Sequence, residues 1–163
     1  MYSTIIELSS SPVAESERVC SDELPEWFYG DIADYIGDAD DRMLSLQCLA
    51  RDMNGFADFD LEQNCLTLKA DAKEKYFQGA YRKYKETLEK LAQVPLEEFS
   101  GISMAPPGSG SLSALMYSLR STIEDRFGTY IYADGELTTL DEWLRYASAG
   151  DVYYIGGVMN YHF

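Results

Sequence analysis

One segment constrains the fold of this chain more than any other, because apolar residues recur in it at helical spacing from Ala70 to about Val94. The stripe consists of Ala72, Tyr76, Phe77, Ala80, Tyr81, Tyr84, Leu88 and Leu91. Its members are adjacent or three to four positions apart, which is the pattern of an amphipathic helix. Pro95 marks the stop, since proline pushes the preceding residue out of the helical region. The sequence therefore predicts one long helix.

Strand-like segments lie on both sides of this helix, so the chain is not all-helical. They are rich in β-branched and aromatic residues and occupy 2–8, 65–68, 129–132, 152–155 and 158–161. Asp134-Gly135 is a strong hairpin signal, and Gly156-Gly157 predicts a bulge or kink between the last two segments. The sequence therefore predicts a β-rich C-terminal third.

Shorter helices complete the pattern. Apolar spacing predicts helices over 22–36 and from 37–38 to Met53, and another from Leu112 that Gly128 closes. Thr139 and Glu142 fit a capping box that begins a short helix. Together these elements predict an α+β fold: a single compact domain over 1–163, with a mostly antiparallel sheet and helices packed on one face. The Pro-, Gly- and Ser-rich stretch 100–111 is expected to be an internal surface loop.

Composition narrows the function. The 163 residues include 28 acids and 13 bases, which gives a formal net charge of −15. Such a charge opposes direct binding to nucleic acid or to an anionic membrane. No apolar run approaches the ~18–20 residues of a membrane span, and the first residues lack the features of a signal peptide. Cys20, Cys48 and Cys65 lack ligand spacing, so we expect free thiols that act mostly as small buried hydrophobes in a cytoplasmic protein.

Residue types that catalysis commonly needs are scarce. His162, next to the last residue, is the only histidine and is expected at a fraying terminus or at the end of an edge strand. No G-x-S-x-G elbow is present, and the loop before Leu112 lacks the lysine of a phosphate-binding loop. The carboxylates in 38–41 and 58–62 are candidates for a divalent cation, but acids that stabilise a helix N-terminus explain the first group better. We therefore assign no catalytic residue, metal or cofactor, and lean toward a protein that is not an enzyme.

Charge is distributed unevenly along the chain. Residues 1–68 contain 3 bases and 15 acids, a net of −12. Residues 69–90 have a net of +3, so the long helix is the one basic segment, and residues 91–163 have a net of −6. Most of the negative charge therefore precedes the long helix.

This distribution leads to the first functional hypothesis, a non-enzymatic interaction protein whose acidic part docks on a basic partner surface. Because duplex DNA carries about one charge per ~1.7 Å, a net of −12 on one face would match roughly 20 Å of duplex. A DNA-mimic inhibitor of a nucleic-acid-binding protein is one form that such a protein takes. The candidate partner-binding residues are Glu15, Glu17, Asp22, Glu23, Glu26, Asp31, Asp34, Asp38, Asp40, Asp41, Asp58, Asp60 and Glu62.

A second hypothesis is a small hydrolase or ligand-binding domain that uses carboxylates near the Tyr-rich C-terminal strands. Its acid–base candidates are Asp58, Asp60, Glu62 and Asp151. This hypothesis requires a deep pocket in which two of these carboxylates meet with raised pKa values. The two hypotheses thus differ in whether the acids converge in a cavity or spread over a surface.

Overall fold

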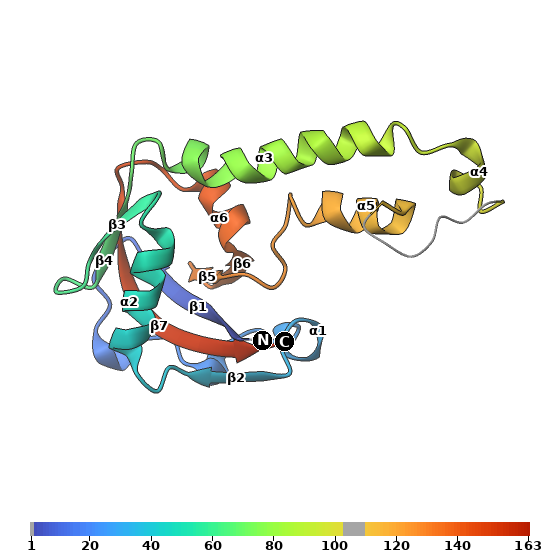
Figure 1. Cartoon of the computed structure of the whole chain (residues 1–163). Coiled ribbons are helices and arrows are strands. Elements are labelled where there is room, and N and C mark those ends of the chain that lie inside the picture. Colours follow the sequence, from blue (N-terminus) through green and yellow to red (C-terminus); the bar gives the residue numbers. More distant parts are fainter. Residues whose placement is uncertain (1, 103–109) are drawn as a thin grey trace. The chain divides into compact units, whose positions relative to one another are not determined.

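The computed structural model describes residues 2–102 and 110–163 (Figure 1). Contacts divide the chain into two compact units, one made of Met1–Lys75 with Asp125–Phe163 and the other of Tyr76–Glu124. A single domain over the whole chain stays a prediction. Part of the expected loop at 100–111, residues 103–109, lies outside the described residues.

The first unit is built on a seven-stranded sheet in the order β3-β4-β7-β1-β5-β6, with β2 also paired to β7. Only the β1–β5 pair is parallel, and every other pair is antiparallel. The α+β class, the mostly antiparallel sheet and the β-rich C-terminus are therefore confirmed. The strands are β1 (Tyr2–Ser9), β2 (Tyr35–Asp38), β3 (Ala57–Asp60), β4 (Cys65–Leu68), β5 (Tyr130–Ala133), β6 (Glu136–Thr139) and β7 (Val152–His162).

A β-bulge lies in the middle of the central strand β7. The register against β1 shifts so that Glu7 alone stands opposite Gly156 and Gly157. Oε2 of Glu7 accepts hydrogen bonds from the N–H groups of Gly157 (2.6 Å) and Val19 (2.9 Å). A Cβ on Gly157 would overlap the carbonyl oxygen of Val19, so only glycine fits there. The two glycines form the predicted bulge, but the predicted segments on either side are one continuous strand.

The other edge of β7 is shared between two strands. β4 pairs with its first half, from Val152 to Tyr154, and β2 pairs with its second half, from Met159 to His162. The carbonyl groups of the residues between these two stretches have no strand partner on that edge. Other groups in the chain therefore have to supply their hydrogen bonds.

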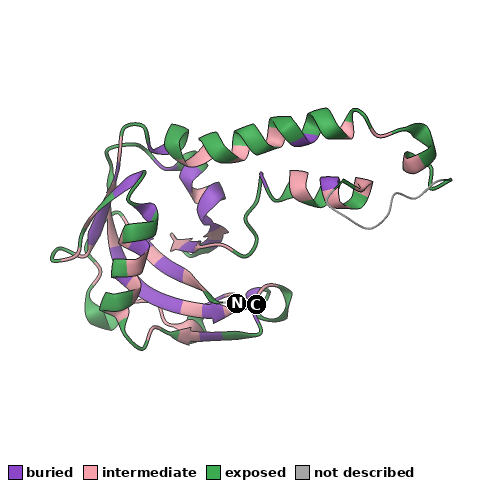
Figure 2. Cartoon of the chain, viewed as in Figure 1, coloured by how far each residue is buried: buried purple, intermediate pink, exposed green. Residues whose placement is uncertain are grey.

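Different segments cover the two faces of the sheet. α2 (Arg42–Met53) and α6 (Leu140–Tyr146) lie on one face, where their residues line a pocket together with Thr4 and Asn160. On the opposite face, Phe28 packs with Ile5, Tyr130 and Tyr161 in a fully buried cluster. This second face is covered by the segment that contains η1 (Glu15–Glu17), η2 (Ser21–Glu23) and α1 (Phe28–Asp31). Figure 2 shows the buried residues concentrated along the central strands.

Helix caps and turns formed where the sequence places a polar side chain within a few residues of its hydrogen-bond partner. The side chain of Asp41 accepts a bond from the N–H of Leu44 and begins α2. Thr139 accepts a bond from the N–H of Glu142 and begins α6, as predicted. Asp134 and Gly135 both have positive φ angles, 53° and 82°, which is the backbone of a tight hairpin turn between β5 and β6.

The expected helix over 22–36 was wrong. Tyr29 is extended (ψ 127°) and Gly30 has a φ of 85°, so α1 is only four residues long. Residues 35–38 are a strand rather than a helix start, because β7 offers them a free edge. Gly128 does not close a helix, since α5 ends at Arg120.

The histidine prediction also needs correction. His162 lies in β7 between β1 and β2, paired with Tyr2 on one side and Tyr35 on the other. Its ring contacts Tyr2 at 4.9 Å, and Nδ1 lies 2.7 Å from Oδ1 of Asp34. The C-terminal strand is central to the sheet, and its end is held from both sides.

The second unit consists mainly of helices. Most of α3 (Ala72–Leu91) belongs to this unit and confirms the long predicted helix, and α4 (Leu96–Phe99) and α5 (Leu112–Arg120) follow it. Ser111 begins α5, where its side chain accepts a hydrogen bond from the N–H of Ala114. Leu115 is buried, whereas Tyr81 is 63% exposed. Among the described residues, no helix combines the length and the apolar character that crossing a membrane requires.

Candidate functional site

Every acidic residue that the sequence singled out for partner binding is exposed. This holds for Glu15, Glu17, Asp22, Glu23, Glu26, Asp31, Asp34, Asp38, Asp40, Asp41, Asp58, Asp60 and Glu62. All of them belong to the first unit. Docking on a partner requires exposure, but the strength of the electrostatic field at the surface depends on which of these charges lie together.

Arg42, the first residue of α2, organises one group of these acids. Its guanidinium lies at the edge of β7 that β4 and β2 leave open, and Nη2 donates to the carbonyl oxygens of Ile155 (3.1 Å) and Gly156 (2.9 Å). Nε donates to the same Gly156 oxygen (3.3 Å), and Nη1 to Oδ1 of Asn64 (2.7 Å). Arg42 thus supplies the hydrogen bonds that the missing strand partner would have made.

Three acidic segments meet around Arg42. The first is the turn that begins with Asp60 and ends at Asn64, the residue whose side chain binds the guanidinium. The second is the end of β2 and the start of α2, which is continuous with Arg42 in the chain. The third contains η1, because Glu15 and Arg18 are close enough to Arg42 to affect its pKa. That pKa is lowered, first by burial and then by the charge of Arg18.

The segment at η2 joins the same group through a backbone hydrogen bond. The N–H of Ser21 donates to Oδ1 of Asp38 at 2.9 Å. Glu23 accepts a bond from the N–H of Cys20 at 2.9 Å, and this bond and the Cys20 thiol lower the pKa of the carboxyl. We call this group the Arg42 end, defined as Glu15, Glu17, Asp22, Glu23, Asp38, Asp40, Asp41, Asp60 and Glu62 around Arg42.

Few of the carboxylates at the Arg42 end are neutralised. Of the three bases in residues 1–68, Arg18 pairs with Glu15 (3.6 Å), Arg51 pairs with Asp52 (3.1 Å), and Arg42 binds no carboxylate among the described residues. Glu15 is therefore the one member with an ion pair within 2–102 and 110–163. The carboxylates of the Arg42 end outnumber Arg18 and Arg42, so the surface keeps a net negative charge.

The other predicted acids lie apart from this group or are paired. Asp58 forms an ion pair with Lys69 at 3.2 Å, so one base of the basic segment compensates one acid. Asp34 is held by His162, and the carbonyl of Asp31 accepts a bond from Arg126. Glu26, Asp31 and Asp34 precede β2, at the end of the strand opposite to Asp38.

An exposed tyrosine stands beside the acids of the Arg42 end. The hydroxyl of Tyr29 donates to the carbonyl of Ser21 at 2.9 Å. The pKa of Tyr29 is raised, first by partial burial and then by the carboxylates of Asp22 and Asp38, which places the ring close to both. Trp27 and Tyr35, in the same part of the chain, are 47% and 60% exposed. Aromatic side chains of this kind are enriched at protein interfaces.

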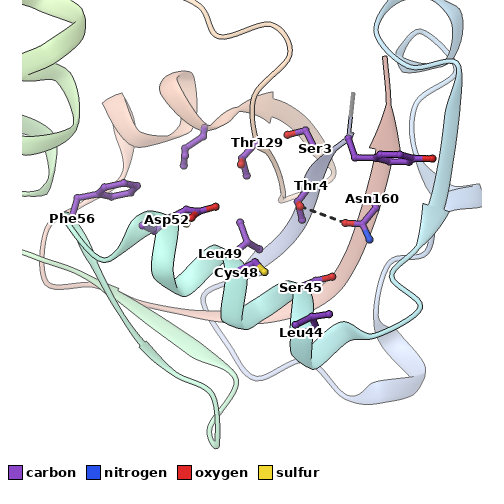
Figure 3. A pocket seen from close by; sticks show the side chains of 13 residues that line it. Ser3, Thr4, Leu44, Ser45, Cys48, Leu49, Asp52, Phe56, Thr129 and Asn160 are labelled. Carbon is purple, nitrogen blue, oxygen red and sulfur yellow. Dashed lines mark hydrogen bonds between the residues drawn. The ribbon is translucent and has the colours of Figure 1, made fainter.

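A pocket beside α2 contains none of the predicted catalytic candidates. It has a volume of about 510 Å³ and lies between α2 and the sheet (Figure 3). Apolar side chains such as Leu49 and Phe56 line it, together with the Thr4 hydroxyl, which donates to Oδ1 of Asn160 at 3.4 Å. Its only carboxylate, Asp52, pairs with Arg51. The pocket therefore lacks the pair of carboxylates that the hydrolase hypothesis requires.

The acid–base candidates are spread over the surface instead. Asp58 and Asp60 lie on β3, Glu62 lies in the turn after it, and Asp151 lies just before β7. All four are exposed, and none lines the pocket beside α2. Across residues 2–102 and 110–163, no three Asp, Glu, His or Cys side chains are grouped closely enough to hold a metal ion.

Sequence reasoning missed the two side chains that organise the surface. Arg42 and Glu7 act through partners 114 and 150 positions away, respectively. Arg42 is a single base next to acids, and Glu7 is the single charged residue in β1. Neither pattern indicates a structural role until the pairing of the strands is known. Nor do known proteins supply the missing information: no protein-family model matches the chain, and neither a curated protein nor a solved structure is detectably similar to it.

Proposed function

We propose that this protein is a non-enzymatic, acidic interaction protein that docks the Arg42 end on a basic surface of a partner protein. One observation carries the proposal: three acidic segments that are far apart in sequence meet around an arginine whose charge is directed at backbone carbonyls. The carboxylates around it are exposed and mostly without a cation. The cytoplasmic location expected from the cysteines belongs to the same proposal.

The physical advantage of such a surface is long-range attraction. Exposed charges act over a Debye length of about 8 Å at physiological salt, so neighbouring carboxylates add to one field. A field of one sign steers a partner of the opposite sign and raises its association rate. Tyr29, which is close to Asp22 and Asp38, adds an aromatic contact of the kind that anchors interfaces. The carboxylates of the Arg42 end then attract the partner, and the Tyr29 ring contributes surface that becomes buried in the complex.

The finer proposal is mimicry of DNA. A nucleic-acid-binding protein presents a basic cleft shaped for an array of phosphates, and an acidic surface can occupy it. Support comes from the −12 net charge of residues 1–68, most of which is exposed. This form of the proposal requires that duplex DNA and the protein compete for the same partner.

The test is the capture of partners from native cell extract. It compares a variant that lacks three carboxylate charges, but keeps every contact within the protein, with a matched control. The side chains of Glu17, Asp40 and Glu62 are exposed and make no hydrogen bond or ion pair among the described residues, so we expect Glu17→Gln/Asp40→Asn/Glu62→Gln to leave the fold unchanged. Its matched control removes three charges from the second unit: Glu86→Gln/Glu89→Gln/Glu97→Gln. We expect the first variant to retain at least tenfold less of a salt-released partner than the control does.

Equal retention by the two triple variants would show that total charge, and not the Arg42 end, governs binding. A captured partner that duplex DNA displaces supports mimicry. One that DNA leaves bound contradicts mimicry while the docking proposal stands.

A further inference from the structure

A second pocket lies on the α2 and α6 face of the sheet, at the edge formed by the β5–β6 hairpin. It has a volume of about 360 Å³ and is lined by residues of the hairpin and of α6. Trp143 and Tyr146 contribute aromatic rings to it, and Asp134, Glu136 and Glu142 contribute carboxylates. The remaining lining residues are small, two alanines and a threonine. No residue of the Arg42 end is among them.

Local structure fixes this arrangement. The hairpin turn carries Asp134 and ends at Glu136, the first residue of β6. Glu142, Trp143 and Tyr146 are spaced one and three positions apart on α6, so they share one side of the helix. The Trp143 ring makes an edge-on contact with Tyr153 at 4.9 Å between centroids, which restrains the indole. Tyr146 is 82% exposed.

The charge of the pocket has one sign. Its three carboxylates take part in no ion pair within the described ranges 2–102 and 110–163, and no lysine or arginine lines it. They are nevertheless too dispersed for one metal ion, because no three such side chains in those ranges form a group that could hold one. An extended cation that donates in several directions matches such spaced carboxylates better than a point charge does.

We propose that this pocket binds a guanidinium cation, as presented by an arginine side chain. Guanidinium is planar, stacks on aromatic faces and donates to several carboxylates at once, whereas an ammonium is a compact and strongly hydrated charge. The pocket offers both features side by side: the rings of Trp143 and Tyr146, and acceptors at Glu136 and Glu142. Its volume is at the small end of the range of ligand pockets, which suits one side chain.

The probe is N-acetyl-arginine amide, and Trp143 reports its binding by fluorescence. Trp27→Phe leaves Trp143 as the only tryptophan, since the chain has two. We expect a saturable change with a Kd of about 1–10 mM, as befits one isolated side chain. N-acetyl-citrulline amide, the uncharged analogue, is expected to produce no saturable change, and N-acetyl-lysine amide is expected to bind several-fold more weakly.

Variants locate the binding. Glu136→Gln/Glu142→Gln is expected to weaken the arginine probe at least tenfold, whereas Glu86→Gln/Glu89→Gln, an equal loss of charge on α3, changes it less than twofold. Absence of a saturable signal in the Trp27→Phe protein overturns the proposal, and so does equal binding of the citrulline probe. Equal weakening by both double variants also overturns it. None of these outcomes depends on the Arg42 end, which the probe does not test.

Discussion

Replacing Arg42 by methionine should destabilise the first unit strongly. Methionine keeps much of the side-chain volume but removes the guanidinium, and with it the bonds to Ile155, Gly156 and Asn64. Two carbonyl groups in the middle of β7 then lose their donor. A hydrogen bond to a charged group contributes about 1.5–3 kcal/mol. Burial lowers the pKa of Arg42, so desolvation offsets part of that gain.

We therefore expect Arg42→Met to lower the free energy of unfolding by about 3 kcal/mol in total. For a chain of this length, about 2–4 °C in Tm corresponds to each kcal/mol, which gives a decrease of about 6–12 °C. Urea unfolding followed by circular dichroism measures the free energy directly. Arg42→Lys should recover only part of the loss, because an ammonium cannot reach the three acceptors in the same fork geometry.

Arg51→Met is the matched control on the same helix. Arg51 is exposed and pairs only with its neighbour Asp52 at 3.1 Å, an interaction worth about 0–1 kcal/mol. Equal destabilisation by Arg51→Met and Arg42→Met would refute the bridging role of Arg42. The position of β2 and of the turn after β3 would then need another explanation.

Two further substitutions test the packing of the first unit. Gly157→Ala directs a methyl group at the carbonyl oxygen of Val19 and should lower the free energy of unfolding in urea by about 1–3 kcal/mol. Gly79→Ala in α3 meets open space and should be neutral or stabilising. The reverse order of the two variants would contradict the described bulge. Asp125 has a raised pKa, first from burial and then from the charge of Asp141, so the folded state favours its protonated form. The contribution of Asp125 to stability should therefore fall as pH rises above 3.8, the ordinary value of this carboxyl. Asp125→Asn should then be more stable than the unsubstituted protein at pH 7, by an amount that shrinks toward pH 3; an unchanged difference between thermal melts at the two pH values would contradict this.

Prediction from sequence succeeded where a signal is contained within a few residues. The apolar run at β4, the Asp134-Gly135 turn and the Thr139 cap each determine their structure locally. The helix expected over 22–36 shows the opposite case. Leu24 and Phe28 have helical spacing, but they face the sheet from an irregular segment that turns at Gly30. Burial against the sheet outweighed helix propensity there.

The sequence predicted which acidic residues are exposed at the candidate surface, but not which of them lie together. Acidic residues in loops and at strand ends are exposed for the general reason that charge stays in water, and that part follows from sequence. The meeting of residues 15–23, 38–42 and 60–64 depends on how β2 and β4 divide the edge of β7. A central strand with two partners on one edge has no signature in the order of residues along the chain.

The most direct test of the central claim is the salt dependence of partner binding. With the captured partner purified, its Kd should be measured from low to physiological and high salt for the intact protein, for Glu17→Gln/Asp40→Asn/Glu62→Gln and for Glu86→Gln/Glu89→Gln/Glu97→Gln. Docking through the Arg42 end predicts that affinity falls steeply with salt for the intact protein and the second variant, and much less steeply for the first. Identical slopes for the two variants would contradict it.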